Sequence, residues 1–218
     1  MTLLLSLEYE GYTIDAHDMD DVENPMKDND LQPVIVLHNQ AQRRYGWNNH
    51  DEWARRINVT LDQIADHGVI KSLYGKGGAL DVIDRWLRIH HKTRSFPFSA
   101  IEHSGVAVYL GSEAHMQDPG GWDSGWVGWI LYNAELAGYP EITDDQLDEG
   151  MRAAFGEFAC WVSGDVFGYT ITDPDGEEVE GCWGFFGLDN LSNDDGWLRQ
   201  ELIATIQAHQ AAKQGEKS

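Results

Sequence analysis

The sequence predicts an α+β fold in which a mainly antiparallel sheet packs with about four helices. The expected strands and helices do not alternate regularly along the chain, and they are not grouped into one block of strands and one of helices. Most connections between the expected strands are long. A length of 218 residues, with 42% hydrophobic residues, is enough for a substantial core. Because no internal repeat or linker-like stretch interrupts the chain, we expect a single acidic domain over residues 1–218.

The first half of the chain carries three types of signal. Residues 3–9 place Leu and Tyr at alternate positions, which predicts a half-buried strand, and the β-branched run at 33–37 predicts another. Residues 14–25 bring acidic side chains too close together for a core element, so we expect an acidic loop there. Helical periodicity predicts helices over about 51–68 and about 78–91.

Two strands and a long helix are expected next. The apolar runs at 101–110 and 127–132 predict strands, with glycine turns between them. Thr143 and Gln146 have the spacing of a capping box, in which each side chain accepts a hydrogen bond from the backbone N–H of the other residue. With Leu, Met and Phe following at helical spacing, the capping box predicts a helix over 143–162.

The C-terminal part predicts a hairpin and a last helix. Residues 166–171 and 179–186 are strand-like, and the turn sequence Asp173-Pro-Asp-Gly176 joins them, so we expect an antiparallel pair. Ser192 is followed by acidic residues that favour a helix N-terminus, which predicts the start of the last helix. Its lysine-bearing end, residues 213–218, is expected to fray.

A segment rich in tryptophan and glycine, Trp122-Asp-Ser-Gly-Trp-Val-Gly-Trp-Ile130, leads into the strand at 127–132. Simple alternation places Trp126 and Trp129 on opposite faces, which implies a strand covered on both sides. The glycines permit close approach of a neighbouring backbone or of a ligand, as do those of Gly181-Cys-Trp-Gly-Phe-Phe-Gly187. Tryptophan stacked over glycine on an adjacent strand is the ordinary explanation, and a ligand site is the alternative.

The formal charge of the chain is -22, from 15 basic and 37 acidic residues. Residues 1–40 carry -8, residues 41–95 carry +4 and residues 96–218 carry -18. Such a surface repels phosphates, so we expect binding to a basic protein rather than direct binding to nucleic acid. Three explanations of the acidity are solubility, metal binding, and carboxylates spaced like phosphates that fill the nucleic-acid groove of another protein.

Metal, cofactor and membrane signals are weak. His17, Asp18, Asp20 and Asp21 could hold a divalent cation, but the sharp-turn glycine and closing glutamate of a calcium loop are missing. A solvated acidic run is the simpler interpretation, so we expect no metal and no cofactor. Acidic residues interrupt the apolar start of the chain, so neither a signal peptide nor a membrane span is expected, and both cysteines are expected to be thiols in the cytosol.

Catalytic motifs are equally sparse. The signatures of nucleotide-binding loops, zinc proteases and serine hydrolases are absent from the sequence. His38, His103, Asp123 and Ser124 could converge, together with Cys182, as the base, nucleophile and orienting acid of an enzyme. A histidine in a strand is more often a half-buried structural residue, so a non-enzymatic role is preferred.

The order of these motifs resembles a family of uncharacterised proteins encoded by bacteriophages and prophages. Its members carry W-D-S-G-Q-V-G followed by an aromatic and a β-branched residue, then an acidic hairpin, then C-W-G-F-Y/F-G; Trp126 stands here in place of the glutamine. The resemblance implies a phage origin and a location in the bacterial host cytoplasm, and it carries no activity. The matching segments are 122–130 and 182–187, with weaker echoes at Asn24-Pro25, Asp28-Asn29, 38–45 and 103–105.

We therefore expect a phage accessory protein that binds and blocks a basic, nucleic-acid-binding host defence protein, as a DNA mimic or in the manner of anti-CRISPR and anti-restriction proteins. The alternatives are a small hydrolase or nucleic-acid-processing enzyme, and a structural or assembly protein. The carboxylates expected to bind the partner are those of Asp144, Asp145, Asp148, Glu149, Asp173, Asp175, Glu177, Glu178, Glu180, Asp194 and Asp195.

Overall fold

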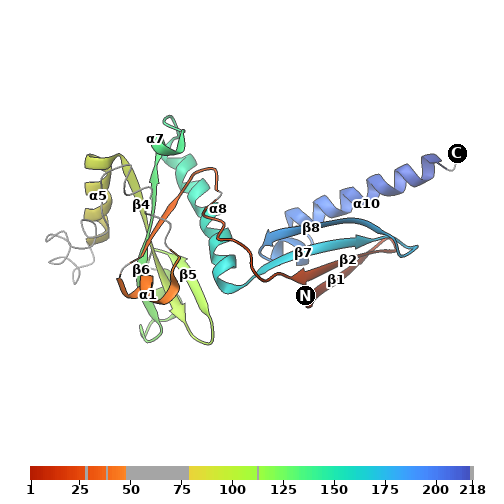
Figure 1. The fold of residues 1–218 in the computed structure, drawn as a ribbon, viewed down its shortest axis with the longest axis horizontal. Helices are drawn as coiled ribbons and strands as arrows, with labels where there is room; N and C mark the ends of the chain where they lie inside the picture. Colours follow the sequence, from red (N-terminus) through yellow and green to blue (C-terminus); the bar gives the residue numbers. More distant parts are fainter. Residues whose placement is uncertain (28, 38, 48–78, 112, 217–218) are drawn as a thin grey trace. The chain divides into compact units, whose positions relative to one another are not determined.

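The computed structural model describes residues 1–27, 29–37, 39–47, 79–111 and 113–216, and these form two four-stranded antiparallel sheets with helices (Figure 1). This arrangement confirms the α+β class. The chain divides into two compact units, where the sequence predicts one domain. Unit 1 combines residues 1–23 with 164–218, and unit 2 contains residues 24–163. The sequence does not mark this division, because unit 1 is assembled from both ends of the chain. The chain passes from one unit to the other after residue 23 and after residue 163, and neither place has a linker-like composition.

The sheet of unit 1 has the strand order β1-β2-β7-β8. The chain enters it through β1 (Leu3–Tyr9) and β2 (Tyr12–Asp18) and returns through β7 (Val166–Thr172) and β8 (Glu178–Phe186). The short helix α9 (Asp189–Ser192) precedes α10 (Trp197–Glu216), which runs along one face of this sheet (Figure 1). The core between them contains Tyr12, Ile14, Ala16, Phe167, Tyr169, Ile171, Leu191, Leu198, Leu202 and Ile206.

Unit 1 confirms the predicted hairpin and corrects two other predictions. The β7–β8 pair turns at Asp173–Gly176, where the Gly176 N–H donates to the Asp173 carbonyl over 3.0 Å. The predicted acidic loop at 14–25 is wrong for its first part, because Ile14 and Ala16 alternate with polar residues and are buried in β2. The last helix, expected to start at Ser192, begins instead at Trp197, because Ser192 ends the short helix α9.

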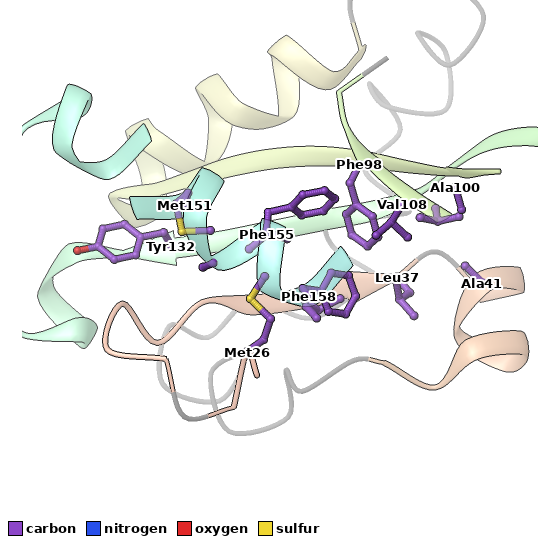
Figure 2. Close-up of a cluster of buried hydrophobic side chains, with 14 of the residues drawn as sticks. Met26, Leu37, Ala41, Phe98, Ala100, Val108, Tyr132, Met151, Phe155 and Phe158 are labelled. Atoms are coloured by element: carbon purple, nitrogen blue, oxygen red, sulfur yellow. The ribbon is translucent and has the colours of Figure 1, made fainter. Parts of the chain in front are cut away.

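The sheet of unit 2 has the strand order β3-β6-β4-β5, and α5 (Ala79–His91) and α8 (Asp144–Ser163) lie on its two sides (Figure 1). The aromatic rings of Phe98 and Phe158 meet edge to face at 6.0 Å in the core beneath α8 (Figure 2). The remaining elements of the unit are β3 (Val34–Leu37), α1 (Asn39–Tyr45), β4 (Thr93–Glu102), β5 (Val106–Leu110), α6 (Glu113–Gln117), β6 (Ser124–Asn133) and α7 (Ala134–Ala137).

Several predicted elements of unit 2 are confirmed, and one is split. The strands at 33–37 and 127–132 and the helices at 78–91 and 143–162 correspond to β3, β6, α5 and α8. The helix predicted at about 51–68 lies outside the described residues. The strand predicted at 101–110 is instead a hairpin, because the chain reverses after β4 at Ser104, where φ is +57°, and returns as β5.

Trp126 and Trp129 lie on the same face of β6, so their predicted separation is wrong. Their ring centroids are 4.3 Å apart and the rings meet edge to face. The β4–β6 register shifts between Phe98 and Ser99, and this bulge reverses the alternation around Val127. The prediction that the strand is covered on both sides is confirmed, since residues 127–133 are all buried.

Candidate functional site

The acidic residues are unequally divided between the two units. Unit 1 contains 18 acidic and three basic residues, a formal charge of -15, whereas unit 2 contains 19 acidic and 12 basic residues, a charge of -7. The electrostatic field that would attract a basic partner is therefore strongest around the smaller unit.

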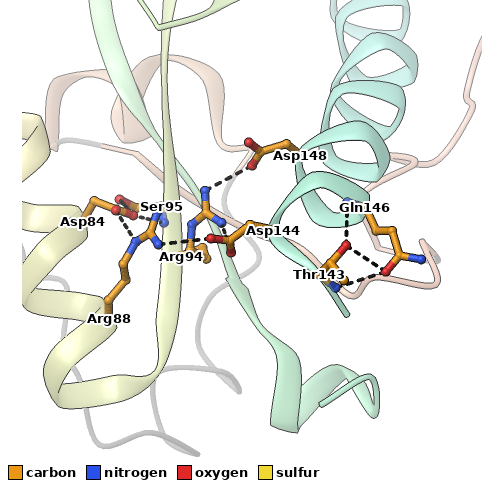
Figure 3. A network of polar contacts seen from close by, with 8 residues as sticks. All are labelled: Asp84, Arg88, Arg94, Ser95, Thr143, Asp144, Gln146 and Asp148. Atoms are coloured by element: carbon orange, nitrogen blue, oxygen red, sulfur yellow. Dashed lines mark hydrogen bonds and ion pairs between the residues drawn. The ribbon is translucent and has the colours of Figure 1, made fainter. Parts of the chain in front are cut away.

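The carboxylates at the start of α8 are partly neutralised by arginines of unit 2 (Figure 3). Arg94 donates from Nη1 to Asp144 over 2.6 Å and from Nη2 to Asp148 over 3.1 Å. Arg88 lies 3.9 Å from the other Asp144 oxygen. Of the four carboxylates predicted to bind a partner here, Asp144 and Asp148 thus already have cationic partners, while Asp145 and Glu149 are exposed.

The carboxylates near the β7–β8 turn divide in the same way. The Asp173 side chain is only 1% exposed and pairs with Lys213, which also lies 3.3 Å from Asp175. The hydrogen bond from Lys213, with backbone N–H groups of the turn, lowers the pKa of Asp173 to about 2. Asp173 is thus buried and already paired, which disfavours its predicted role in binding a partner.

Two further carboxylates that were predicted to bind a partner interact instead with side chains of unit 1. Asp194 pairs with Arg199 at 2.8 Å. Glu180 accepts a hydrogen bond of 2.5 Å from the Tyr169 hydroxyl, and this interaction and burial raise the pKa of Tyr169. Five members of the predicted set are exposed in this unit, and two of them, Asp175 and Asp194, have a cationic partner. The other three are Glu177, Glu178 and Asp195.

The sheet surface opposite α10 brings Glu178 together with two acidic residues outside the predicted set, Glu8 and Asp15. Cross-strand pairing aligns Glu8 with Thr13, Thr172 and Glu178, and the next row aligns Ser6 with Asp15, Thr170 and Gly181. A third row contains Leu3, His17, Gly168 and Trp183. We call these three rows the polar face of unit 1. The sequence does not single out Glu8 and Asp15, because their strands are far from the hairpin along the chain and only the pairing of β1, β2 and β7 brings them to one surface.

The loop before β6 is organised by Asp118, another residue that the sequence analysis missed. Asp118 Oδ2 accepts hydrogen bonds of 2.9 Å from the backbone N–H groups of Asp123 and Ser124. These bonds, together with one from the Ser124 side chain, lower the pKa of Asp118. Asp118 therefore fixes the turn that leads into β6.

A cavity of about 400 Å³ lies beside this loop. Arg44 and Tyr45 of α1, Glu102 of β4 and residues 122–127 line it, and Arg44 forms an ion pair with Glu102. Residues 44–45 and 122–127, which are far apart in the sequence, thus meet at one place. The volume is within the range of small-molecule sites, so the cavity could accommodate a small ligand.

The predicted catalytic set converges only in part. His103 Nδ1 lies 3.1 Å from Asp123 Oδ2, so these two residues meet as an enzyme would require, but their side chains are 81% and 45% exposed. The Ser124 hydroxyl interacts with Asp118, whereas a hydrolytic serine donates to its base. His38 lies outside the described residues, and Cys182 is exposed in unit 1. The arrangement supports an oriented imidazole more than a catalytic triad.

Among the described residues, no group of three or more His, Cys, Asp or Glu side chains is arranged to hold a metal ion. The candidate ligands His17 and Asp18 lie at the end of β2, where a backbone hydrogen bond from Thr2 lowers the pKa of Asp18. Within the described ranges, no helix combines the length and apolar character that crossing a membrane requires.

Comparison of the chain with protein-family models, with curated proteins and with solved structures finds no match. The candidate sites therefore stand on their own geometry.

Proposed function

We propose that the protein is a phage-encoded accessory protein that acts in the bacterial cytoplasm by binding a basic, nucleic-acid-binding host protein through unit 1. The observation that carries this proposal is the charge of -15 on unit 1. Arg199 and Lys213, the two basic residues of this unit that the structure describes, are paired with acidic side chains of the same unit. Little positive charge therefore remains to oppose the field of the other carboxylates.

The concentration of charge in one unit favours binding over a general solubility role. Unit 2 has almost the same number of acidic residues but balances 12 of them with basic ones. A requirement for solubility alone does not demand such a difference between two parts of one chain. Carboxylates on a sheet surface instead present negative charges to a partner, as the phosphates of nucleic acid do. They therefore compete with nucleic acid for the cationic groove of that partner.

Capture experiments test this proposal. The tagged full chain is incubated with bacterial lysate at about 50 mM and about 200 mM salt, because charge-driven association weakens steeply over this interval. We expect nucleic-acid-binding proteins to be retained at low salt and to be released by higher salt and by duplex DNA. A retained complex that is insensitive to both treatments would overturn the proposal.

Matched variants locate the binding charge. The double variant Glu8→Gln and Glu178→Gln removes two exposed carboxylates from unit 1, and Asp145→Asn with Glu149→Gln removes two from unit 2. Both change the net charge equally, so a difference between them reports position. We expect the unit 1 variant to lose more of the captured partner, and equal losses would mean that binding is not specific to unit 1.

A further inference from the structure

Trp183 presents an indole ring on the polar face of unit 1. A Cβ atom on Gly168 would lie 1.8 to 2.6 Å from three carbons of this ring, so one face of the indole rests directly on the Gly168 backbone. The ring centroid is 6.3 Å from that of His17, which lies on β2, on the other side of Gly168 and β7. Trp183 is nevertheless 41% exposed, which leaves aromatic surface available to another molecule.

Carboxylates lie in the row next to Trp183. Asp15 is two residues from His17 on β2 and accepts a hydrogen bond of 2.6 Å from the Ser6 hydroxyl. Glu178 extends along β8, since its Oε1 atom lies 3.3 Å from where a Cβ atom of Gly181 would be. Asp15 thus belongs to the row of Thr170 and Gly181, and the Glu178 carboxylate reaches toward this row from the next one, which Glu178 shares with Glu8.

We propose that the polar face of unit 1 binds an extended basic segment of a partner protein, with an arginine over Trp183 and further basic side chains over the carboxylate rows. This inference rests on the proposed function and adds to it the binding face, the anchoring residue and the conformation of the bound segment.

The choice of arginine follows from the chemistry around the ring. A guanidinium stacks on an indole face and is more weakly hydrated than an ammonium, so it gains more from this contact. Asp15 and Glu178 add negative charge one row away, which favours a cation and opposes a phosphate or carboxylate ligand.

The choice of an extended segment follows from the spacing of the rows. Residues two apart in a strand are separated by about 7 Å, and this is also the separation between successive rows on one face of the sheet. A segment in β conformation with basic residues at every second position therefore brings one cation to each row. A helical segment, rising about 1.5 Å per residue, does not have this repeat.

Synthetic peptides test the inference with the full chain. One peptide alternates Arg and Ser, a second has the same composition with the arginines in one block, and a third alternates Lys and Ser. We expect the alternating Arg peptide to bind most tightly by calorimetry at low salt. Trp183→Ala should weaken its binding by about two- to thirtyfold, the size of an aromatic–cation contact, and should reduce the preference for Arg over Lys.

The controls separate this inference from the proposed function. Trp197→Ala removes another exposed tryptophan of unit 1, one that packs against Phe185 on the α10 side of the sheet, and should leave peptide binding unchanged. Asp15→Asn provides a second test on the polar face if Trp183→Ala unfolds, and it should weaken binding of the alternating peptide. If the two tryptophan variants behave alike, or the block peptide binds as tightly, the inference is overturned while the proposed function stands. If no basic peptide or protein binds, both fail.

Discussion

At the scale of single residues, Asp173 shows how one carboxylate organises a turn and connects it to a distant helix. Its Oδ1 atom accepts hydrogen bonds of 2.9 Å from the backbone N–H groups of Asp175 and Glu177, and its other oxygen pairs with Lys213 of α10. The turn was predictable from the local sequence Asp-Pro-Asp-Gly. The lysine was not, because 40 residues separate it from Asp173.

Replacing Asp173 with Asn should destabilise the protein in a pH-dependent way. The pKa of Asp173 is lowered to about 2 in the folded chain, against an ordinary value near 4. Its contribution to stability is therefore fully present above about pH 4 and is lost as the pH falls toward about 2. Thermal unfolding of wild type and Asp173→Asn should differ at neutral pH and converge in acid. Asp175→Asn, at the exposed partner of the same lysine, should have a smaller effect, and a difference that stays constant with pH would contradict this account.

At the scale of elements, α8 is the part of the fold that the sequence predicts best. Its capping box forms as expected, with Thr143 N–H donating to Gln146 Oε1 over 3.1 Å and Gln146 N–H donating to Thr143 Oγ1 over 3.3 Å (Figure 3). Its buried residues, among them Met151 and Phe158, follow the helical period. Local hydrogen bonding and periodicity determine both features, so a single sequence is sufficient to predict them.

The elements that were missed depend on pairing between distant segments. The bulge that puts Trp126 and Trp129 on one face exists only against β4, and β2 is recognisable as a strand only when β7 is beside it. The candidate site shows the same pattern. Glu178 was selected from its local sequence, whereas Glu8 and Asp15 join it only through the order β1-β2-β7-β8.

Removal of the Thr143 cap should lower the stability of the chain by about 1 kcal/mol, with a range of about 0.5–2 kcal/mol for such caps. In Thr143→Ala the backbone N–H of Gln146 loses its acceptor and α8 loses part of its N-terminal stabilisation. Urea unfolding monitored by circular dichroism measures the difference. Thr143→Ser keeps a hydroxyl at the same place and should retain most of the stability; if Ser is as damaging as Ala, the hydrogen bond is not the cause.

At the scale of the whole molecule, the two units differ in how many of their acidic side chains can pair with basic ones. Unit 2 pairs acidic with basic side chains, as Arg94 does with Asp144 and Asp148. Unit 1 has few basic residues with which to do so. The total charge follows directly from the sequence. Its division between the two units does not, because residues 1–23 and 164–218 share one sheet only in the folded chain.

This division predicts that salt stabilises unit 1 more than unit 2. Repulsion among carboxylates opposes the compact state, and the screening length falls from about 30 Å at 0.01 M salt to about 8 Å at 0.15 M. Screening also weakens the ion pairs of Lys213 and Arg199. Unit 1 has only three basic residues but 18 acidic ones, so the weaker repulsion among carboxylates outweighs the weaker ion pairs. Hydrogen exchange resolved by mass spectrometry should slow in β2 and β7 as salt is added, with a smaller change in β6. Equal responses in the two sheets would show that the self-repulsion is not concentrated in unit 1, and the electrostatic basis for its role in binding would then be lost.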